Sequence, residues 1–450
     1  RAISWHNLFR QHNSCWWWTS WGCDYTPFNP DGTQTRYGKW YFDEARELRG
    51  GIGKLLLGSR RSDSGVAILY SQADHFASAL ARHLAPKAPY GNWMRNLEAA
   101  GRVVEDCGLQ YRFVARGSLN EEGLRGYRAL VLPLATCLSD GDIAALRDFV
   151  EEGGTLIVDG RLGLLTENGG IRAQRPFADI LGIDPSAGIQ AFKAVEPLRK
   201  VDMDGEAMEL PALGPGTLLA SVPLGKGRII RTNLAFRRIA AGRDTKEDRP
   251  LAKRFAALLR EAGLSSPATL SPAPVCVEQT LFQQGAARYL CLQQDIHQRG
   301  LAAQRFVITI AEPGFVYDSR TGTPLSDNRL ETWDAEISRG RPRVFAILPY
   351  RVPELKISCA GVGRLGEVAS FRVKVEGSAG VVGRHVVHLS VFAPGSTVEH
   401  RLYSTNIDCP GGVGRGTVPF VVNDSPGEWR FEFRDAATGV QATHTLLMRH

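Results

Sequence analysis

The stretch from Tyr127 to Gly160 constrains the fold more than any other part of the chain. It begins with an apolar run, 129–132, and runs of this length and composition are typical of a strand buried on both faces. Ser139 is placed to cap a helix that ends at the glycine pair 153–154, and a second apolar run follows at 155–158. Strand, helix and strand within about 30 residues predict one right-handed βαβ unit of a parallel sheet.

The same alternation of strands and helices extends on both sides of this unit. Apolar strands are expected at 66–70, 111–114 and 227–232, and helices at 92–107 and 250–262. We therefore predict a doubly wound α/β domain over residues 59–270.

The first 58 residues have a different pattern. The end of an amphipathic helix at 4–10 precedes a tryptophan-rich strand, a long loop and a helix from Tyr41 to Leu57. This order is typical of the last turn of a (β/α)8 barrel, so residues 1–58 are interpreted as the C-terminal part of such a barrel.

Beyond a Ser- and Pro-rich linker at 265–274 the helical patterns end. Short strands at 288–292, 306–310, 315–318 and 344–348 predict a small β-sandwich over 275–350. Alternating strands such as 369–375 and 429–433 predict an immunoglobulin-like sandwich over 354–450. The expected fold class is α/β plus all-β.

Composition excludes several classes of function. The net charge of +7 is scattered, without the clustering that nucleic-acid binding requires, and no segment of about 18 apolar residues could span a membrane. The eight cysteines contain no CxxC pair and the glycines at 50–58 do not follow a strand, so neither a metal nor a cofactor is expected. The chain begins Arg1-Ala2-Ile3, without an initiator Met or a signal peptide, and we interpret it as a piece of a longer polypeptide.

Tryptophans supply the candidate substrate-binding residues. Trp16 and Trp18 share one face of the expected strand, Trp21 follows, and indole faces suit stacking on sugar rings. Asp24 lies on the loop expected at the mouth of the barrel. The alternatives are core packing for the tryptophans and turn formation for the loop, which also carries Asn29-Pro30 and Asp31-Gly32.

Two positions at strand ends of the α/β domain are candidates for chemical sites. Cys137 precedes a helix N-terminus, where a thiolate is favoured, but it lacks the flanking glycines of a nucleophile elbow. Asp74 and His75 follow the strand at 66–70, where ligands bind in such sheets, and a capped turn is the alternative. No catalytic residue is assigned.

Several stretches of the chain resemble the β-galactosidases of glycoside hydrolase family 42. They are the helix and aromatic strand at 5–21, the turn Phe28-Asn29-Pro30-Asp31-Gly32, the helix at 44–57, the segments 66–71, 127–133 and 149–156, and the strand-turn at 316–322. The resemblance covers roughly residues 1–350. The last hundred residues lie outside the usual family pattern, and the stretch from Asn423 to Trp429 is similar to strand-turn sequences of macroglobulin-like accessory modules.

The resemblance implies a trimerisation domain with a glutamine-amidotransferase-like α/β fold. Family members are retaining glycosidases, which need two carboxyl groups about 5 Å apart. In the family these are glutamates on barrel strands four and seven, which would precede residue 1, so this chain contains neither. The family often has a Trp-Arg pair after strand eight, whereas here Trp18 is followed by Thr19.

The favoured interpretation is therefore the C-terminal portion of a retaining glycosidase that acts on β-linked sugars and assembles as a homo-oligomer, possibly a trimer. One alternative is a non-catalytic assembly protein that binds carbohydrate, and another is an amidotransferase-like enzyme that uses Cys137. The immunoglobulin-like tail favours an extracytoplasmic location.

Overall fold

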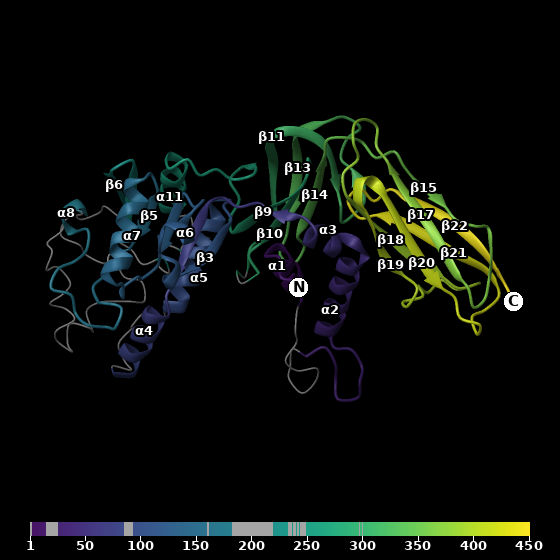
Figure 1. Ribbon diagram of the computed structural model, residues 1–450, viewed down its shortest axis with the longest axis horizontal. Coiled ribbons are helices and arrows are strands. Elements are labelled where there is room, and N and C mark those ends of the chain that lie inside the picture. The colour runs from purple at the N-terminus through teal and green to yellow at the C-terminus, as the bar shows by residue number, and fades with distance from the viewer. Residues whose placement is uncertain are drawn as a thin grey trace. The chain divides into compact units, whose positions relative to one another are not determined.

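The computed structural model describes residues 2–14, 26–84, 93–159, 162–181, 219–232, 236, 240, 243, 249–296, 298 and 300–450. The chain divides into two compact units (Figure 1). Unit 1 contains residues 1–62, 267–274 and 279–450, and unit 2 contains residues 63–266 and 275–278.

Unit 2 is built on a six-stranded sheet in the order β3-β2-β4-β5-β7-β6. Its strands are β2 (Val66–Tyr70), β3 (Tyr111–Ala115), β4 (Ala129–Leu132), β5 (Thr155–Val158), β6 (Leu219–Leu224) and β7 (Gly227–Thr232). The strands β3, β2, β4, β5 and β7 are parallel, and β6 joins β7 as an antiparallel edge. The strand order reverses between β2 and β4. From β2 the chain adds β3 toward one edge of the sheet, and from β4 it adds β5 and β7 toward the other edge.

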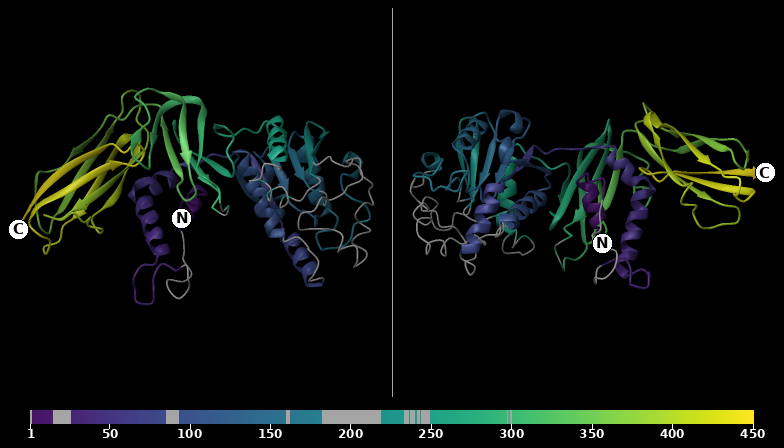
Figure 2. Two further views of the ribbon diagram at one scale, coloured as in Figure 1. Left: turned by 180° about the vertical axis from the view of Figure 1, so that it is seen from behind. Right: turned by 60° about the horizontal axis from the view of Figure 1, so that its bottom comes forward.

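Helices cover both faces of this sheet (Figure 1 and Figure 2). The helices of unit 2 are α4 (Gln72–Leu84), α5 (Trp93–Asp106), α6 (Glu121–Leu124), α7 (Asp140–Glu151), α8 (Ala178–Leu181) and α11 (Arg249–Glu261), with a 3-10 turn η2 (Arg116–Ser118). One core joins α5 and α11 to Ile68, Val131 and Ile157. The other joins α6, α7 and α8 to Leu69 and Leu132.

The expected βαβ unit is confirmed as β4, α7 and β5. Strands β4 and β5 pair in parallel with Ala129 opposite Thr155. The Ser139 side chain accepts a hydrogen bond from the backbone of Asp142, whose side chain accepts one from the backbone of Ser139, and this capping box fixes the start of α7. The segment with Asp74 and His75, for which a capped turn was the alternative, begins helix α4 directly after Ser71, whose Oγ accepts a hydrogen bond from the backbone of Asp74 at 3.2 Å.

The N-terminal helices of unit 1 pack on β-strands of the same unit. They are α1 (Ile3–Phe9), α2 (Arg36–Glu47), the π-helical turn η1 (Leu48–Ile52) and α3 (Gly53–Leu57). The helix expected over 41–57 is wrong in one respect, because non-helical backbone at Gly50 and Gly51 separates α2 from α3. Gly51 has a φ of 110°, which residues with a Cβ rarely adopt.

An eight-stranded sheet follows in unit 1. Its strands are β1 (Arg60–Arg61), β8 (Thr269–Ser271), β9 (Val277–Gln284), β10 (Ala287–Gln294), β11 (Gln304–Asp318), β12 (Thr323–Pro324), β13 (Leu330–Ile337) and β14 (Arg343–Leu348). The two strands expected at 306–310 and 315–318 are one strand, β11, whose register with β13 shifts between Thr309 and Gly314. The first half of β11 pairs with β8 and β13, and its second half with β14. The expected linker at 265–274 contains β8, so it is not entirely irregular.

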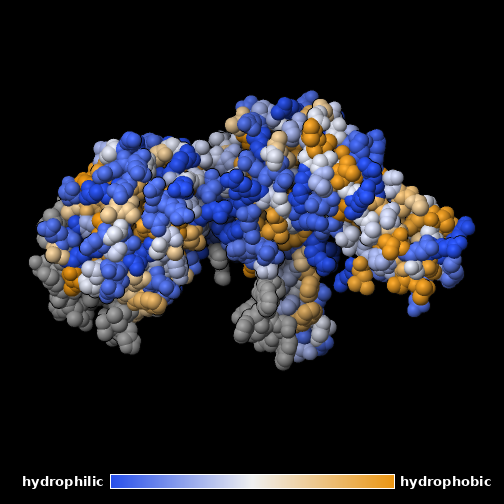
Figure 3. Space-filling model, viewed as in Figure 1, coloured by the Kyte–Doolittle hydropathy of each residue, from blue (hydrophilic) through white to orange (hydrophobic). Residues whose placement is uncertain are grey.

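Two further sheets form the C-terminal part of unit 1. One contains β15 (Glu354–Ser358), β17 (Val368–Glu376) and β20 (Val413–Pro419), and the other contains β16 (Val362–Arg364), β18 (His385–Phe392), β19 (Thr405–Cys409), β21 (Gly427–Asp435) and β22 (Gln441–Arg449), with a 3-10 turn η4 (Pro410–Gly412) before β20. Phe371 of one sheet contacts Phe431 of the other, with ring centroids 4.8 Å apart. Exposed apolar residues are also found in this part of unit 1 (Figure 3): Val362 and Val368 lie on strands, and Val381, Val398, Leu402, Val421 and Val422 lie in loops.

Two findings limit the kinds of site that the described residues can form. No helix among them is long and apolar enough to cross a membrane. In the same part of the chain, no three His, Cys, Asp or Glu side chains converge to hold a metal ion.

Candidate functional site

The four candidate substrate-binding residues, Trp16, Trp18, Trp21 and Asp24, lie outside the described residues, as does the expected strand that carries three of them. Their roles therefore stay predictions. The loop that follows is described from residue 26 onward.

The loop at 26–35 forms a hydrogen-bonded turn. The Asp31 carboxylate accepts hydrogen bonds from the backbone and the hydroxyl of Thr33, at 2.9 and 2.6 Å, and these bonds lower the pKa of Asp31. Gly32 has a φ of 82°, as the Asp-Gly pair predicts. Turn formation accounts for Asp31, so nothing in this geometry assigns it to a ligand.

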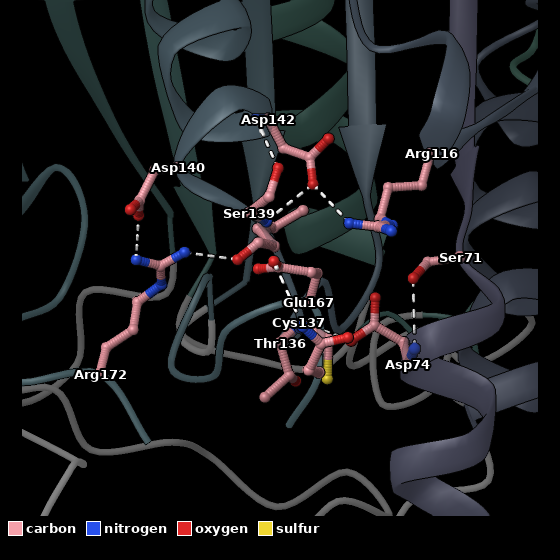
Figure 4. A network of polar contacts seen from close by, with 12 residues as sticks. Ser71, Asp74, Arg116, Thr136, Cys137, Ser139, Asp140, Asp142, Glu167 and Arg172 are labelled. Atoms are coloured by element: carbon pink, nitrogen blue, oxygen red, sulfur yellow. Dashed lines mark hydrogen bonds and ion pairs between the residues drawn. The ribbon is translucent and has the colours of Figure 1, made fainter. Parts of the chain in front are cut away.

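In unit 2, the segments that follow β2 and β4, which carry Asp74 and Cys137, meet at the carboxyl ends of these two neighbouring strands. Asp74, in the first turn of α4, is 3% exposed. Its Oδ1 accepts hydrogen bonds from the backbone N–H groups of Thr136 and Cys137, both at 2.7 Å (Figure 4). Burial raises the pKa of Asp74 to about 7, although hydrogen bonds from Ser71, Cys137 and Thr136 act in the opposite direction. The structure therefore brings together two positions, 74 and 137, that the sequence could only treat separately.

A second buried carboxylate, Asp159, also accepts a hydrogen bond from the turn after β4. Asp159, directly after β5, is 2% exposed, and its Oδ2 accepts a hydrogen bond from the backbone of Leu134 at 2.6 Å. Leu134 has a φ of 47°, so the turn after β4 adopts a left-handed conformation that needs such support. The sequence analysis missed Asp159, although an aspartate directly after a buried strand was the available signal.

The thiol of Cys137 is protected rather than reactive. The side chain is 1% exposed, and burial, followed by the nearby Asp74, raises its pKa far above the usual range. The segment after β5 lies against this turn, because Leu138 donates to the Leu165 carbonyl at 3.1 Å and Leu165 donates to the Thr136 carbonyl at 2.9 Å. A nucleophilic cysteine must be ionised and must be accessible to a substrate. The raised pKa of Cys137 disfavours the thiolate, and its burial prevents access.

Charged side chains surround the start of α7 (Figure 4). Arg116 Nη1 lies 2.8 Å from Asp142 Oδ2, the carboxylate of the capping box. Arg172 contacts Asp140 and the carbonyl of Leu138. These contacts join the segments that follow β3, β4 and β5 to the N-terminus of α7. Their role in this geometry is structural.

Comparisons with known proteins match one part of the chain to a described family. Residues 64–213 match the family model of the beta-galactosidase trimerisation domain. No curated protein matches the chain.

Two solved structures illustrate the similarity. A catalytic mutant of Gan42B, a GH42 beta-galactosidase from G. stearothermophilus, is 13% identical, with a TM-score of 0.51 over 76% of this chain and 50% of that one. The beta-galactosidase from Bacillus circulans sp. alkalophilus is 16% identical, with a TM-score of 0.48 over 72% of this chain and 47% of that one. The chain thus spans about half the length of these relatives.

The fold is similar to part of the Gan42B beta-galactosidase, with β-sheets predominating and one mostly parallel sheet that carries helices on both faces. The predicted resemblance to the glycoside hydrolase family 42 β-galactosidases is confirmed by the match of residues 64–213 to the family model of their trimerisation domain.

Proposed function

We propose that this chain is the C-terminal portion of a retaining glycoside hydrolase resembling β-galactosidase. In this proposal residues 1–58 complete a catalytic barrel, the α/β domain mediates assembly, and the two β-domains are accessory. The catalytic carboxylates lie upstream of residue 1, and the substrate is a β-linked sugar.

The match of residues 64–213 to a trimerisation domain is the observation that carries this proposal. The structure of the turn at Cys137 supports it, because the position where an amidotransferase-like fold would hold its nucleophile is closed by Asp74 and by the segment around Leu165. A scaffold of this kind is suited to assembly rather than to thiol chemistry.

Strand β3 is a candidate for the contact between subunits. It is an edge strand of the sheet, and its Phe113 side chain is 53% exposed. Phe76 in α4 is 63% exposed. Edge strands and exposed aromatic side chains favour association with another chain.

The test is the mass of the purified chain in solution together with its activity. We expect a trimer by light scattering and no hydrolysis of nitrophenyl β-galactoside. A monomer at all accessible concentrations would refute the assembly role. Hydrolysis would show that this chain itself contains the catalytic carboxylates, contrary to the proposal.

The second candidate is a non-catalytic assembly protein whose β-domains bind polysaccharide. The closed turn at Cys137 and the exposed apolar residues in the loops of the C-terminal part, such as Val381, Val398 and Leu402, favour it. A full-length sequence decides between the two candidates, because the glycosidase requires an Asn-Glu pair and a second Glu at barrel-strand ends.

A further inference from the structure

One turn of the C-terminal sheets contacts other parts of unit 1. It comprises residues 435–440, between β21 and β22, and its Ala436 and Ala437 are fully buried. The Ser319 hydroxyl, in the segment that follows β11, donates to the Ala437 carbonyl at 2.8 Å. Arg434, at the end of β21, donates through Nη2 to the Ser319 carbonyl at 3.1 Å. The 435–440 turn is therefore hydrogen-bonded to the segment after β11.

The same turn approaches two glycines of unit 1 closely. A Cβ on Gly439 would overlap the backbone of Gly322, and a Cβ on Gly322 would lie 3.0 Å from the Gly439 Cα. Gly51 lies in the break between α2 and α3, and a Cβ there would lie 2.8 Å from the Cβ of Ala436. Contacts this close require that no side chain intervenes. One turn thus packs against both the segment after β11 and the break after α2.

Both of these segments are connected to the C-terminal end of α2. Arg320 Nη2, in the segment after β11, lies 2.8 Å from Oε2 of Glu47, the last residue of α2. The Arg320 guanidinium also covers the ring of Trp5 in α1, with its central carbon 4.9 Å from the ring centroid. In the break after α2, the Arg49 carbonyl accepts a hydrogen bond from Asn406 Nδ2 of β19 at 2.8 Å. The C-terminal sheets therefore restrain the end of α2 at two separate points.

Buried polar groups fix the shape of the 435–440 turn. Asp435 is 0% exposed, and its Oδ2 accepts hydrogen bonds from the backbone and the hydroxyl of Thr438, at 3.0 and 2.6 Å. Its Oδ1 lies 3.0 Å from Nδ1 of His385, whose Nε2 lies 3.0 Å from the Tyr350 hydroxyl. A buried network whose members are all paired is rigid. The turn can therefore transmit a fixed position to the segments that it contacts.

We propose that the two C-terminal sheets of unit 1 hold α2 in position through the 435–440 turn. The partner of this interaction surface is the helical segment 36–57 of the same chain, which the turn contacts at the break after α2 and through the segment after β11. The C-terminal sheets are thus a positioning element for the N-terminal helices. The inference goes beyond the proposed function, because it requires neither catalysis nor trimer formation.

Hydrogen exchange of the full chain, measured by mass spectrometry, tests this inference. Gly439→Ala forces the turn away from Gly322, and we expect the amides of α2 to exchange at least about tenfold faster than in the wild type. Asn406→Ala removes the hydrogen bond to the Arg49 carbonyl and accelerates exchange in α2 about two- to tenfold. The second variant decides the question if Gly439→Ala does not fold.

Matched controls separate loss of these contacts from general destabilisation. Gly395→Ala, in the same part of unit 1, has the same backbone strain at a φ of 71° but open space around its Cβ. Asn423→Ala replaces an exposed asparagine in that part of the chain. Both leave exchange in α2 unchanged, and strands β9 and β10 exchange in Gly439→Ala and Asn406→Ala as they do in the wild type.

Three results would overturn the inference. They are unchanged exchange of α2 in Asn406→Ala and in a folded Gly439→Ala, equal acceleration of α2 by Gly395→Ala and Gly439→Ala, and equal acceleration of β9, β10 and α2, which would show general unfolding of unit 1. The oligomer mass and the hydrolysis assay, measured separately, decide the proposed function.

Discussion

Replacement of Asp74 tests whether a buried, largely protonated carboxyl holds the turn after β4. Its folded pKa is raised from 3.8 to about 7 by burial. Between these two values the folded state binds more protons than the unfolded state, so unfolding free energy falls as pH rises. At about 1.4 kcal/mol per pKa unit, the wild type loses about 3 kcal/mol between pH 5 and pH 8 through this group.

Asp74→Asn keeps the oxygen that accepts from Thr136 and Cys137 but carries no charge. We expect it to match the wild type within about 1 kcal/mol near pH 4, and to exceed it by up to about 4 kcal/mol at pH 8. Asp74→Ala leaves the N–H of Cys137 without an acceptor and costs about 1–3 kcal/mol at pH 5. The N–H of Thr136 keeps the Leu134 carbonyl, at 2.8 Å, as a second acceptor.

Urea unfolding followed by circular dichroism at several pH values measures these differences. Asp148→Asn, an exposed position on α7, is the control and shows no such pH dependence. If Asp74→Asn is less stable than the wild type at pH 8 by more than about 1 kcal/mol, the ionised carboxylate is favourable and the reasoning is refuted.

Three other predictions follow from the described contacts. Phe113→Glu places a charge on the exposed edge strand and raises the dissociation constant of the proposed trimer at least about tenfold, as light scattering over a dilution series measures. Gly51→Ala lowers the unfolding free energy by about 1–3 kcal/mol, because its φ is 110° and a Cβ would lie 2.8 Å from a neighbouring side chain. The Cys137 thiol reacts with iodoacetamide more slowly in the folded chain than the half-buried Cys359 does, as mass spectrometry of the labelled peptides shows.

Controls make these predictions decisive. Val362→Glu, an exposed apolar position in unit 1, leaves the trimer intact, and equal effects at Phe113 and Val362 would contradict the choice of β3. Gly50→Ala has open space around its Cβ and changes stability by less than about 0.5 kcal/mol. Labelling of Cys137 as fast as that of Cys359 would show that the turn opens readily.

The sequence predicted local structure best where several signals agreed. At 127–160, apolar runs, a capping serine and terminal glycines all specify one βαβ unit, and β4, α7 and β5 form as expected. Between Tyr41 and Leu57 the apolar period continues through Gly50 and Gly51, so periodicity alone predicted one helix. The available signal was the Gly50-Gly51 pair itself, since a glycine pair also ends the helix at 153–154, and Gly51 additionally lies close to Ala436 in the folded chain.

The contacts at the turn after β4 could not be predicted from the sequence. Asp74 and Cys137 are separated by 62 intervening residues, and only the parallel pairing of β2 with β4 brings their chain segments together. The sequence indicated that each follows a buried strand, and this suggested ligand chemistry at either position. Their mutual hydrogen bond shows why the strand-end carboxylate serves the fold.

The packing of unit 1 bears on how the N-terminal segment can function. Trp5, Phe9 and Leu55 share one core with Tyr289 of β10 and Val344 of β14. Because these helices lack a separate core in the described part of the chain, their stability depends on the strands that follow some 230 residues later. The Arg320–Glu47 pair adds a charged link between the same elements. If residues 1–58 complete a barrel, the β-strands therefore support its closing helices. Truncation after residue 266 would remove these strands and leave the helices without their core.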